Sequence, residues 1–442
     1  MARLLVLGEW LLADTSSPPL PDAGVLVDAS QIVAAGPAAD LCAAYPGAEV
    51  LRAPDRAIVP GFVNTHHHMY GVLAHGLPLE QAPAGFWPFL RDFWWPRVED
   101  ALTHELITAA VDWACLEMVR SGITTFYDCL EAPSALPGAL DMEAAVLRRW
   151  GLRGILSFEA TQRRGEAIAE LGLQENVRFI DSTRSQDGLI SGLMCYHTTF
   201  TCSPDYIRRA FALAADRGVS VHMHLSEGTY EPEYCLRTYG VRPIEHYRRL
   251  GVLGPAMLAS QCVQVTAAEL DLLAEAGARV SHMPLSNCEV GGGFAPVPEM
   301  LSRGITVGLG TDGYINNFFE VMRGAFFMPK ARLQDPTVMP AATVWRMATE
   351  DGAQALGLTR VGRLQPGYAA DLLLIRTDLP TPLSPSNLCD QLLLWRNPED
   401  ITDVMASGVW LKRNGRVLGS DEAAIRERCR AAARKLWEAS LG

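Results

Sequence analysis

The chain has 442 residues and a formal net charge of −12 at pH 7; 49% of its residues are hydrophobic and 20% are charged. These values are ordinary for a globular protein and allow one large domain or two. The acidic balance, with no run of lysines or arginines, argues against a nucleic-acid partner.

The first 59 residues contain short apolar runs separated by Pro, Gly and Asp turns, a pattern typical of antiparallel β-strands. Glu9 interrupts the first run and no small-residue cleavage site follows it, so we interpret this run as a strand and not as a signal peptide. No uncharged apolar run approaches the ~18 residues that a membrane span requires, and we expect no membrane partner.

From about residue 100 the chain repeats one unit, in which an amphipathic helix ends at a glycine and an apolar strand follows at once, and we assign residues 60–361 to one domain. The stretch THELITAAVDWACLEMVRSG, for example, has apolar residues at helical spacing and is followed by the strand-like ITTFYD. Such alternation predicts a parallel sheet covered on both faces. About eight strand candidates end in polar residues, and in a (β/α)8 TIM barrel such ends meet at one mouth. We therefore predict a TIM barrel, with an open doubly wound sheet as the alternative.

The apolar runs of residues 366–418 are similar to those at the N-terminus, and neither set is long enough to bury a core alone. We expect them to join in one small β-sandwich built from residues 1–59 and 362–420. Residues 421–442 have the pattern of an amphipathic C-terminal helix. The ten cysteines form no CxxC motif, and several lie in apolar runs, so we expect buried thiols in a cytoplasmic protein.

Three histidines follow one another in FVNTHHHMYG, at the end of the first predicted barrel strand. Alternate side chains of a strand point to opposite faces, so His66 and His68 share one face and His67 points away from it. Such a pair can offer two imidazoles to one metal ion. Taken alone the pair is a weak signal, because histidines in turns and cores are common.

Two further segments place metal-binding side chains at strand ends. In VHMHLSE, His224 is followed by Glu227 just beyond the strand, and in GLGTDG the carboxylate of Asp312 follows the last strand. Together with His66 and His68, these residues offer three imidazoles and a carboxylate. That donor set suits one divalent first-row metal ion, with Zn²⁺ as the first choice and Fe²⁺ as the alternative.

The segments PGFVNTHHHMYG, VHMHLSE and GLGTDG resemble the signature of the amidohydrolase superfamily, in its single-metal branch. That branch includes guanine, 8-oxoguanine and adenosylhomocysteine deaminases and the triazine hydrolases. WWPRVEDALT and NNFFEVMRGAFF are most similar to a subgroup of aminohydrolases and chlorohydrolases. The resemblance covers nearly the whole chain and implies a TIM barrel with a composite sandwich. It also implies that His66, His68, His224 and Asp312 bind the metal and that Glu227 is a catalytic proton shuttle.

The scarcity of lysine bears on the number of metal ions. Two-metal members of the superfamily bridge their ions with a carboxylated lysine at the end of the fourth strand. Here that strand ends on His197, and the first lysine of the chain is Lys330, so we expect one ion. The resemblance implies a metal-bound hydroxide that attacks a ring carbon, with Glu227 and Asp312 moving protons. The first hypothesis is hydrolytic deamination of a purine, pterin, pyrimidine or triazine; the alternative is hydrolysis of another ring C–N or C–Cl bond.

One position departs from the superfamily pattern. The sixth strand usually ends on a histidine, and this chain has Gln261 there, in MLASQCVQV. Glutamine forms hydrogen bonds but does not titrate. Three interpretations stay open: Gln261 holds the hydroxide or substrate by hydrogen bonds alone, the reaction is a variant one, or the protein binds metal and ligand with weakened catalysis. A second departure is Gly71, where purine deaminases often have a glutamine that contacts the ring.

Four residues are candidate substrate contacts. His197 is expected to point into the mouth of the barrel. Trp87 and Trp94 belong to an aromatic-rich loop after the first strand, and aromatic rings stack on flat heterocycles, although core packing or a subunit contact explains them equally well. His282, in RVSHMPLSN, is similar to a histidine of many relatives, with a core or loop role as the alternative. A homodimer or larger homo-oligomer is expected only because relatives often form one.

Overall fold

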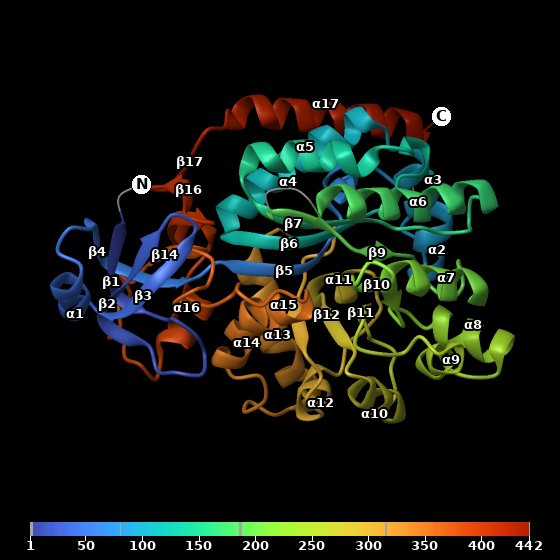
Figure 1. Ribbon diagram of the computed structural model, residues 1–442. Coiled ribbons are helices and arrows are strands. Elements are labelled where there is room, and N and C mark those ends of the chain that lie inside the picture. The colour runs from blue at the N-terminus through green and yellow to red at the C-terminus, as the bar shows by residue number, and fades with distance from the viewer. Residues whose placement is uncertain (1–2, 80, 185–187, 314–315, 442) are drawn as a thin grey trace.

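The structure is a computed structural model that describes residues 3–79, 81–184, 188–313 and 316–441. It consists of a β/α barrel and a separate eight-stranded sheet beside it, drawn mainly in blue and red in Figure 1.

The barrel contains parallel strands at eight positions. They are β5 (Phe62–His67), β6 (Ile123–Leu130), β7 (Arg153–Phe158), β8 (Ile190–Gly192) with β9 (Met194–Cys195), β10 (Val221–Leu225), β11 (Met257–Gln261), β12 (Arg279–His282) and β13 (Val307–Leu309). The strands pair in the orders β5-β6-β7-β8 and β9-β10-β11-β12-β13. Two single parallel bridges, His67–Asp312 and Ala160–Tyr196, join these two sheets. The predicted TIM barrel is therefore confirmed, and the open sheet is not found.

Helices cover the outside of this barrel. They are α4 (His104–Ser121), α5 (Ala139–Trp150), α6 (Glu166–Thr183), α7 (Pro204–Ala215), α8 (Tyr230–Tyr239), α9 (Pro243–Leu250), α10 (Ala267–Ala276), α11 (Pro284–Glu289), α12 (Val297–Ser302), α13 (Phe318–Leu333), α14 (Ala341–Ala348) and α15 (Glu350–Ala355). Local sequence sets their ends. Helix α4 begins at Thr103, whose side chain accepts a hydrogen bond from the Leu106 amide, and ends at Gly122 with φ of 82°. Thr266 and Glu269 form a capping box at the start of α10.

As predicted, the two ends of the chain join in one unit beside the barrel, and this unit is built on one eight-stranded sheet. Its order is β17-β16-β15-β14-β4-β1-β2-β3. The strands are β1 (Leu4–Leu11), β2 (Leu20–Asp28), β3 (Gln31–Pro37), β4 (Glu49–Pro60), β14 (Leu372–Arg376), β15 (Ile401–Ala406), β16 (Val409–Arg413) and β17 (Arg416–Val417). The antiparallel ladder between β4 and β14 joins the N-terminal part to the C-terminal part. Apolar side chains from both parts, such as Val25 and Leu372, bury one another, which neither part achieves alone.

Three more helices complete the fold around this frame. Helices α1 (Ala38–Ala44) and α16 (Leu388–Trp395) lie in the connections of the terminal sheet, and α17 (Glu422–Leu441) crosses the barrel helices at the top of Figure 1. Helix α17 packs on α4 and on η1 (Met69–Ala74), and the indole nitrogen of Trp437 donates a 2.7 Å hydrogen bond to the Leu73 carbonyl. None of the helices in the described part of the chain is both long and apolar enough to cross a membrane.

Candidate metal centre and active site

Three strands bring the predicted metal ligands together at the carboxyl end of the barrel. His66 lies on β5 with His68 just after it, His224 lies on β10, and Asp312 follows β13. The Nε2 atoms of His68 and His224 are 3.4 Å apart. The Oδ1 atom of Asp312 lies 3.5 Å from His68 Nε2 and 3.8 Å from His66 Nε2. All four side chains are buried, so these atoms face one small volume.

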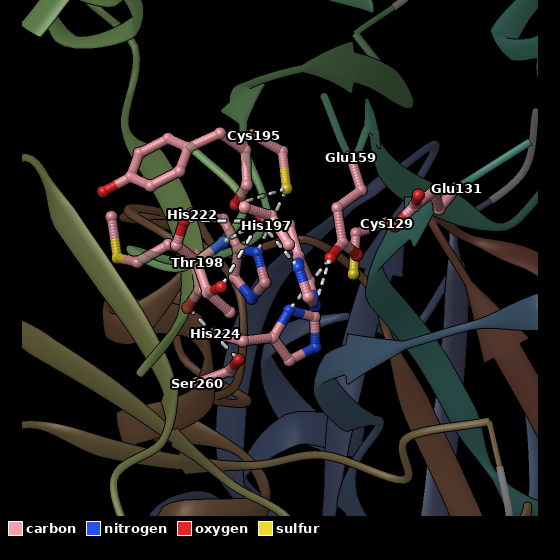
Figure 2. A network of polar contacts seen from close by, with 12 residues as sticks. Cys129, Glu131, Glu159, Cys195, His197, Thr198, His222, His224 and Ser260 are labelled. Carbon is pink, nitrogen blue, oxygen red and sulfur yellow. Dashed lines mark hydrogen bonds and ion pairs between the residues drawn. The ribbon is translucent and has the colours of Figure 1, made fainter. Parts of the chain in front are cut away.

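The contacts of the Nδ1 atoms show which imidazole nitrogens present a lone pair to that volume. The Nδ1 atom of His68 lies 2.8 Å from the Cys129 carbonyl oxygen, which only accepts, so Nδ1 carries the proton and Nε2 a lone pair. The Nδ1 atom of His224 faces the Glu159 carboxylate at 3.2 Å, as the dashed lines of Figure 2 show. The buried Nε2 atom of His66 has no hydrogen-bond partner. These three nitrogens and the Asp312 carboxylate form a donor set that fits a divalent metal ion.

Glu159, which directly follows β7, orients two histidines. Its Oε1 atom lies 3.2 Å from His224 Nδ1 and 3.5 Å from His197 Nε2. Burial opposes a charge on His224, but the Glu159 carboxylate outweighs it and raises the pKa of His224 to about 10. The site therefore attracts positive charge at His224 Nε2, in the form of a proton or of a metal ion that displaces the proton. Glu159 was not predicted as a site residue, although a carboxylate at a strand end was a usable signal in the sequence.

A second group of buried side chains lies against the imidazoles; Figure 2 shows Cys129, Cys195 and His222 close to His224. The Nε2 atom of His222 lies 3.1 Å from His66 Nδ1, and the Cys195 thiol lies 3.3 Å from His222 Nδ1. The Cys129 thiol lies 3.6 Å from His68 Nδ1. Burial raises the pKa of the Cys129 thiol well above its usual range, which favours the neutral thiol.

Gln261, the residue that departs from the superfamily pattern, contacts the ligand carboxylate directly. Its amide nitrogen donates a 2.9 Å hydrogen bond to Asp312 Oδ2, and the Ser286 hydroxyl donates a second one of 2.8 Å to the same oxygen. Gln261 is fully buried, and it is not among the described residues that line the cavity. It therefore holds Asp312 with Oδ1 turned toward the imidazoles and does not reach a substrate in this geometry.

The chain turns sharply where these strands end. Ser226, Gln261 and Asp312 have φ values of 51°, 74° and 58°, in the left-handed region that residues other than glycine rarely adopt. Such strain persists only where surrounding contacts impose it, and it is typical of functional sites.

A cavity of about 610 Å³ opens above the ligands, and Glu227 lines it beside them. Burial, together with the nearby Asp312 charge, raises the pKa of Glu227 to about 8. The carboxyl group is therefore protonated at neutral pH and can donate a proton into the cavity.

Two of the four predicted substrate contacts line this cavity. They are His197 and Trp94. His197 is held by a 2.9 Å contact between its Nδ1 atom and the Thr201 hydroxyl.

The other two predicted contacts lie elsewhere among the described residues. Trp87 stacks on Tyr230, with ring centroids 3.9 Å apart and 5° between the planes. His282 lines a separate void of about 10 Å³ with Phe294 and Met328, and burial lowers its pKa to about 3. The positions of Trp87 and His282 therefore agree with a packing role, which was the alternative interpretation of both residues.

The close packing of the backbone explains why position 71 is a glycine. A Cβ atom there would lie 2.6 Å from the carbonyl oxygen of Gly313, so the two backbones approach too closely for any side chain. The ring-contacting glutamine of purine deaminases therefore has no room at this position.

The aromatic-rich segment forms one wall of the cavity. It comprises α2 (Phe86–Pro88), η2 (Phe89–Trp94) and α3 (Trp95–Arg97). Phe86 packs on the backbone of Gly228, where an added Cβ atom would lie 2.9 Å from the phenyl ring. Because Gly228 follows Glu227 directly, this contact fixes the wall next to the protonated carboxyl group.

Comparisons with known proteins agree with this geometry. The profile described as the Amidohydrolase family matches residues 57–411, and one described as an imidazolonepropionase-like composite domain of bacteria matches residues 23–48. The chain is 33% identical to the 5'-deoxyadenosine deaminase of Methanothermobacter thermautotrophicus over 402 residues, which are 88% of this chain and 89% of that protein. It is 34% identical to the 5-methylthioadenosine/S-adenosylhomocysteine deaminase of Nitratidesulfovibrio vulgaris over 408 residues, 91% and 90% of the two chains.

A solved structure is also similar over the full length. The crystal structure of an adenosine deaminase from Xanthomonas campestris with bound zinc has a TM-score of 0.89 and 26% identity, and 98% of each chain is covered. The resemblance inferred from the three sequence motifs is confirmed, and the chain belongs to the amidohydrolase family.

Proposed function

We propose that the protein is a zinc-dependent hydrolase that deaminates an amino-substituted nitrogen heterocycle, with an adenine-type ring as the leading candidate. The observation that carries the proposal is the position of Glu227 in a largely apolar cavity beside His68, His224 and Asp312, where burial raises the pKa of its carboxyl group to about 8. The deaminase names of the relatives support the choice of ring and of reaction.

In this proposal His66, His68, His224 and Asp312 hold one Zn²⁺ ion. Such an ion would lower the pKa of a bound water toward ~7, so that a nucleophile is available at neutral pH. Glu159 fixes the ring of His224, and Gln261 with Ser286 fixes the carboxylate of Asp312. These contacts support a rigid ligand set, which catalysis by positioning requires.

The proton transfers follow from the positions of two carboxyl groups. Glu227 donates its proton to the ring nitrogen beside the amino-bearing carbon, while the water oxygen adds to that carbon. One water proton passes through Asp312 to the amino group, which leaves as ammonia, and the other restores Glu227. The carbon thus exchanges its bond to nitrogen for a bond to oxygen, and the ring nitrogen keeps the proton that Glu227 supplied.

The test is ammonia release by the zinc-loaded protein with a panel of amino-purines, pterins, pyrimidines and triazines. We expect stoichiometric ammonia with the ring intact for at least one amino-purine. Release of chloride, or an opened ring without ammonia, would instead establish the alternative reaction. Tight ligand binding with no turnover of any compound would establish a binding protein.

Glu227→Gln tests the proton shuttle. The variant keeps the shape of the side chain but has no proton to donate, so kcat is expected to fall by about 10²–10⁴-fold with metal content unchanged. The matched control is Glu233→Gln, at an exposed position on α8. Full activity of Glu227→Gln would disprove the assigned role.

A further inference from the structure

The cavity discriminates among substrates by the charge of the part that lies away from the reacting ring. We infer that this part of the substrate is uncharged and apolar, and that compounds carrying a carboxylate or phosphate there are rejected. The inference rests on the proposed function, because it places the reacting ring at the metal end of the cavity.

The ionisable groups of the cavity wall are almost all acidic or imidazole. Five carboxyl groups line it, from Glu99, Glu159, Glu227, Glu289 and Asp312; Glu227 carries its proton, Glu159 and Asp312 lie against the site histidines, and Glu99 pairs with Arg163. Among the described residues that line the cavity there is no lysine or arginine. An anionic group that enters this space loses its hydration without meeting a cationic side chain, which strongly disfavours its binding.

Arg163, which pairs with the lining residue Glu99, is already neutralised. Arg163 forms ion pairs with Glu99 at 3.2 Å, with Asp100 at 2.8 Å and with Glu131 at a shorter distance. Its guanidinium also lies 5.2 Å from the centre of the Trp95 ring, and only 9% of its side chain is exposed. Three carboxylates thus hold this one cation, and it is not free to bind an anionic substrate.

A second arginine, on the aromatic segment, is engaged in the same way. Arg91 donates two hydrogen bonds to Asp92, of 2.6 and 2.7 Å, and lies 5.8 Å from the centre of the Trp87 ring. Since Trp87 stacks on Tyr230 and is not among the described lining residues, Arg91 lies over a ring outside the cavity.

The rest of the cavity wall offers apolar surface. Most of this apolar surface comes from the segment after β5, namely Leu77, Phe86, Phe89, Leu90 and Phe93. Val290, which directly follows α11, adds a further apolar side chain from a distant part of the sequence. A volume of about 610 Å³ lies in the middle of the range for sites that enclose drug-sized ligands, so it has room for more than a lone ring. A hydrophobic substituent on the ring fits this space and its lining.

The decisive experiment compares compounds that share one ring and differ only in the substituent. We would measure kcat/KM of the zinc-loaded protein with 5'-methylthioadenosine, S-adenosylhomocysteine and adenosine 5'-monophosphate, and the binding of each by calorimetry. The expected result is a kcat/KM at least about 100-fold higher for 5'-methylthioadenosine than for either anion-bearing compound, with binding in the same order. Equal or stronger binding of an anion-bearing compound would overturn the inference.

The two readouts separate this inference from the proposed function. If none of the three compounds releases ammonia, deamination of the adenine-type ring is wrong, while the order of affinities still decides the charge preference. If all are deaminated at similar rates with similar affinities, deamination stands and the charge preference is wrong.

Two substitutions of Val290 provide a gain-of-function test. Val290→Lys adds a cation to the cavity wall, and Val290→Met adds an uncharged side chain of similar length. We expect the ratio of kcat/KM for S-adenosylhomocysteine over that for 5'-methylthioadenosine to be at least about tenfold higher in the lysine variant than in the methionine variant. The same ratio in both variants would show that charge in the cavity wall does not set the preference.

Discussion

At the scale of single residues, the Asp312 carboxylate faces two different environments. One oxygen faces the imidazoles, and the other accepts hydrogen bonds from Gln261 and Ser286. Gln261 thus takes the place of a titrating histidine with a contact that only positions the ligand. Outer contacts of this kind typically change metal affinity or activity by about 10–100-fold when they are removed.

Gln261→Leu removes that contact and keeps a buried side chain of similar size. We expect metal affinity and kcat to fall by about 10–100-fold, because Asp312 loses one of the two donors that orient it. Gln261→His, which retains a donor, is expected to lose less. The control is Gln264→Leu, since the Gln264 side chain bonds to the Gly292 carbonyl and not to a ligand. The readouts are metal content, measured by mass spectrometry, and kcat. If both stay unchanged in Gln261→Leu, the hydrogen bond from Gln261 to Asp312 is unimportant.

His224 gives the metal site a defined dependence on pH. Its pKa of about 10 means that, below pH 10, the ion must displace a proton from this imidazole. Apparent metal affinity should therefore rise as the pH rises from 6 to 9, by about tenfold per unit from this residue. Glu159→Gln removes the charge that raises the pKa of His224. In this variant the plot of metal affinity against pH should therefore already become flat near neutral pH. Competition with a chelator at several pH values measures the metal affinity of the wild type and of Glu159→Gln. An equal slope in the two proteins would contradict the role assigned to Glu159.

At the scale of elements, the aromatic wall is held to the barrel by few but direct contacts. Phe86 packs on Gly228 and Trp87 on Tyr230, while Trp95 lies 5.7 Å from the His197 ring. All three partners lie in the segments that follow β9 and β10, His197 after β9 and Gly228 and Tyr230 after β10. The wall and the catalytic strands thus behave as one unit, and displacement of the wall should affect substrate binding before it affects folding.

Gly228→Ala tests this coupling. The new methyl group would meet the Phe86 ring at 2.9 Å, so the wall must move by a few tenths of an ångström. We expect KM to rise by about three- to tenfold with little change in thermal stability, since the wall positions substrate. Gly254→Ala is the control, because no atom lies within 4 Å of the added carbon. A loss of stability without a change of KM would show that the contact serves folding only.

At the scale of the whole molecule, the last helix packs on α4 and η1 and adds its apolar side chains to the main core. Ile425, Cys429, Ala432 and Leu436 of α17 are buried in the main core. The cytoplasmic location, the homo-oligomer and the domain boundaries at residues 59/60 and 361/362 stay predictions.

Leu436→Ala measures what this helix contributes. Leu436 is fully buried, so the free energy of unfolding should fall by about 2–5 kcal/mol through lost burial and the cavity left behind. The substitution lies far from the ligands in sequence, and metal content should not change. Urea denaturation of this variant and of Glu427→Ala, at an exposed position on the same helix, gives the comparison. Equal stability of the two variants would mean that α17 does not support the core.

Much of the fold and the ligand set follow from local sequence. The helix-glycine-strand units predict the barrel, and the two-residue period of strands assigns His66 and His68 to one face. The roles of Glu159, Gln261, Trp87 and His282 depend on contacts between segments distant in sequence. Gln261 meets Asp312 across 51 residues, and Trp87 finds its partner on α8, so neither contact is encoded in a local pattern.

The bridge between His67 and Asp312 makes the metal site a clasp for the barrel as well as a centre for chemistry. Strands β5 and β13 lie about 245 residues apart in the chain and close the ring of strands at this bridge, where the His67 imidazole also contacts the Asp312 carbonyl oxygen at 2.6 Å. Two ligands lie on the β5 side of that seam and one on the β13 side. An ion held by all three, as we propose, would fasten the first strand to the last, and its removal is expected to weaken the barrel at this seam.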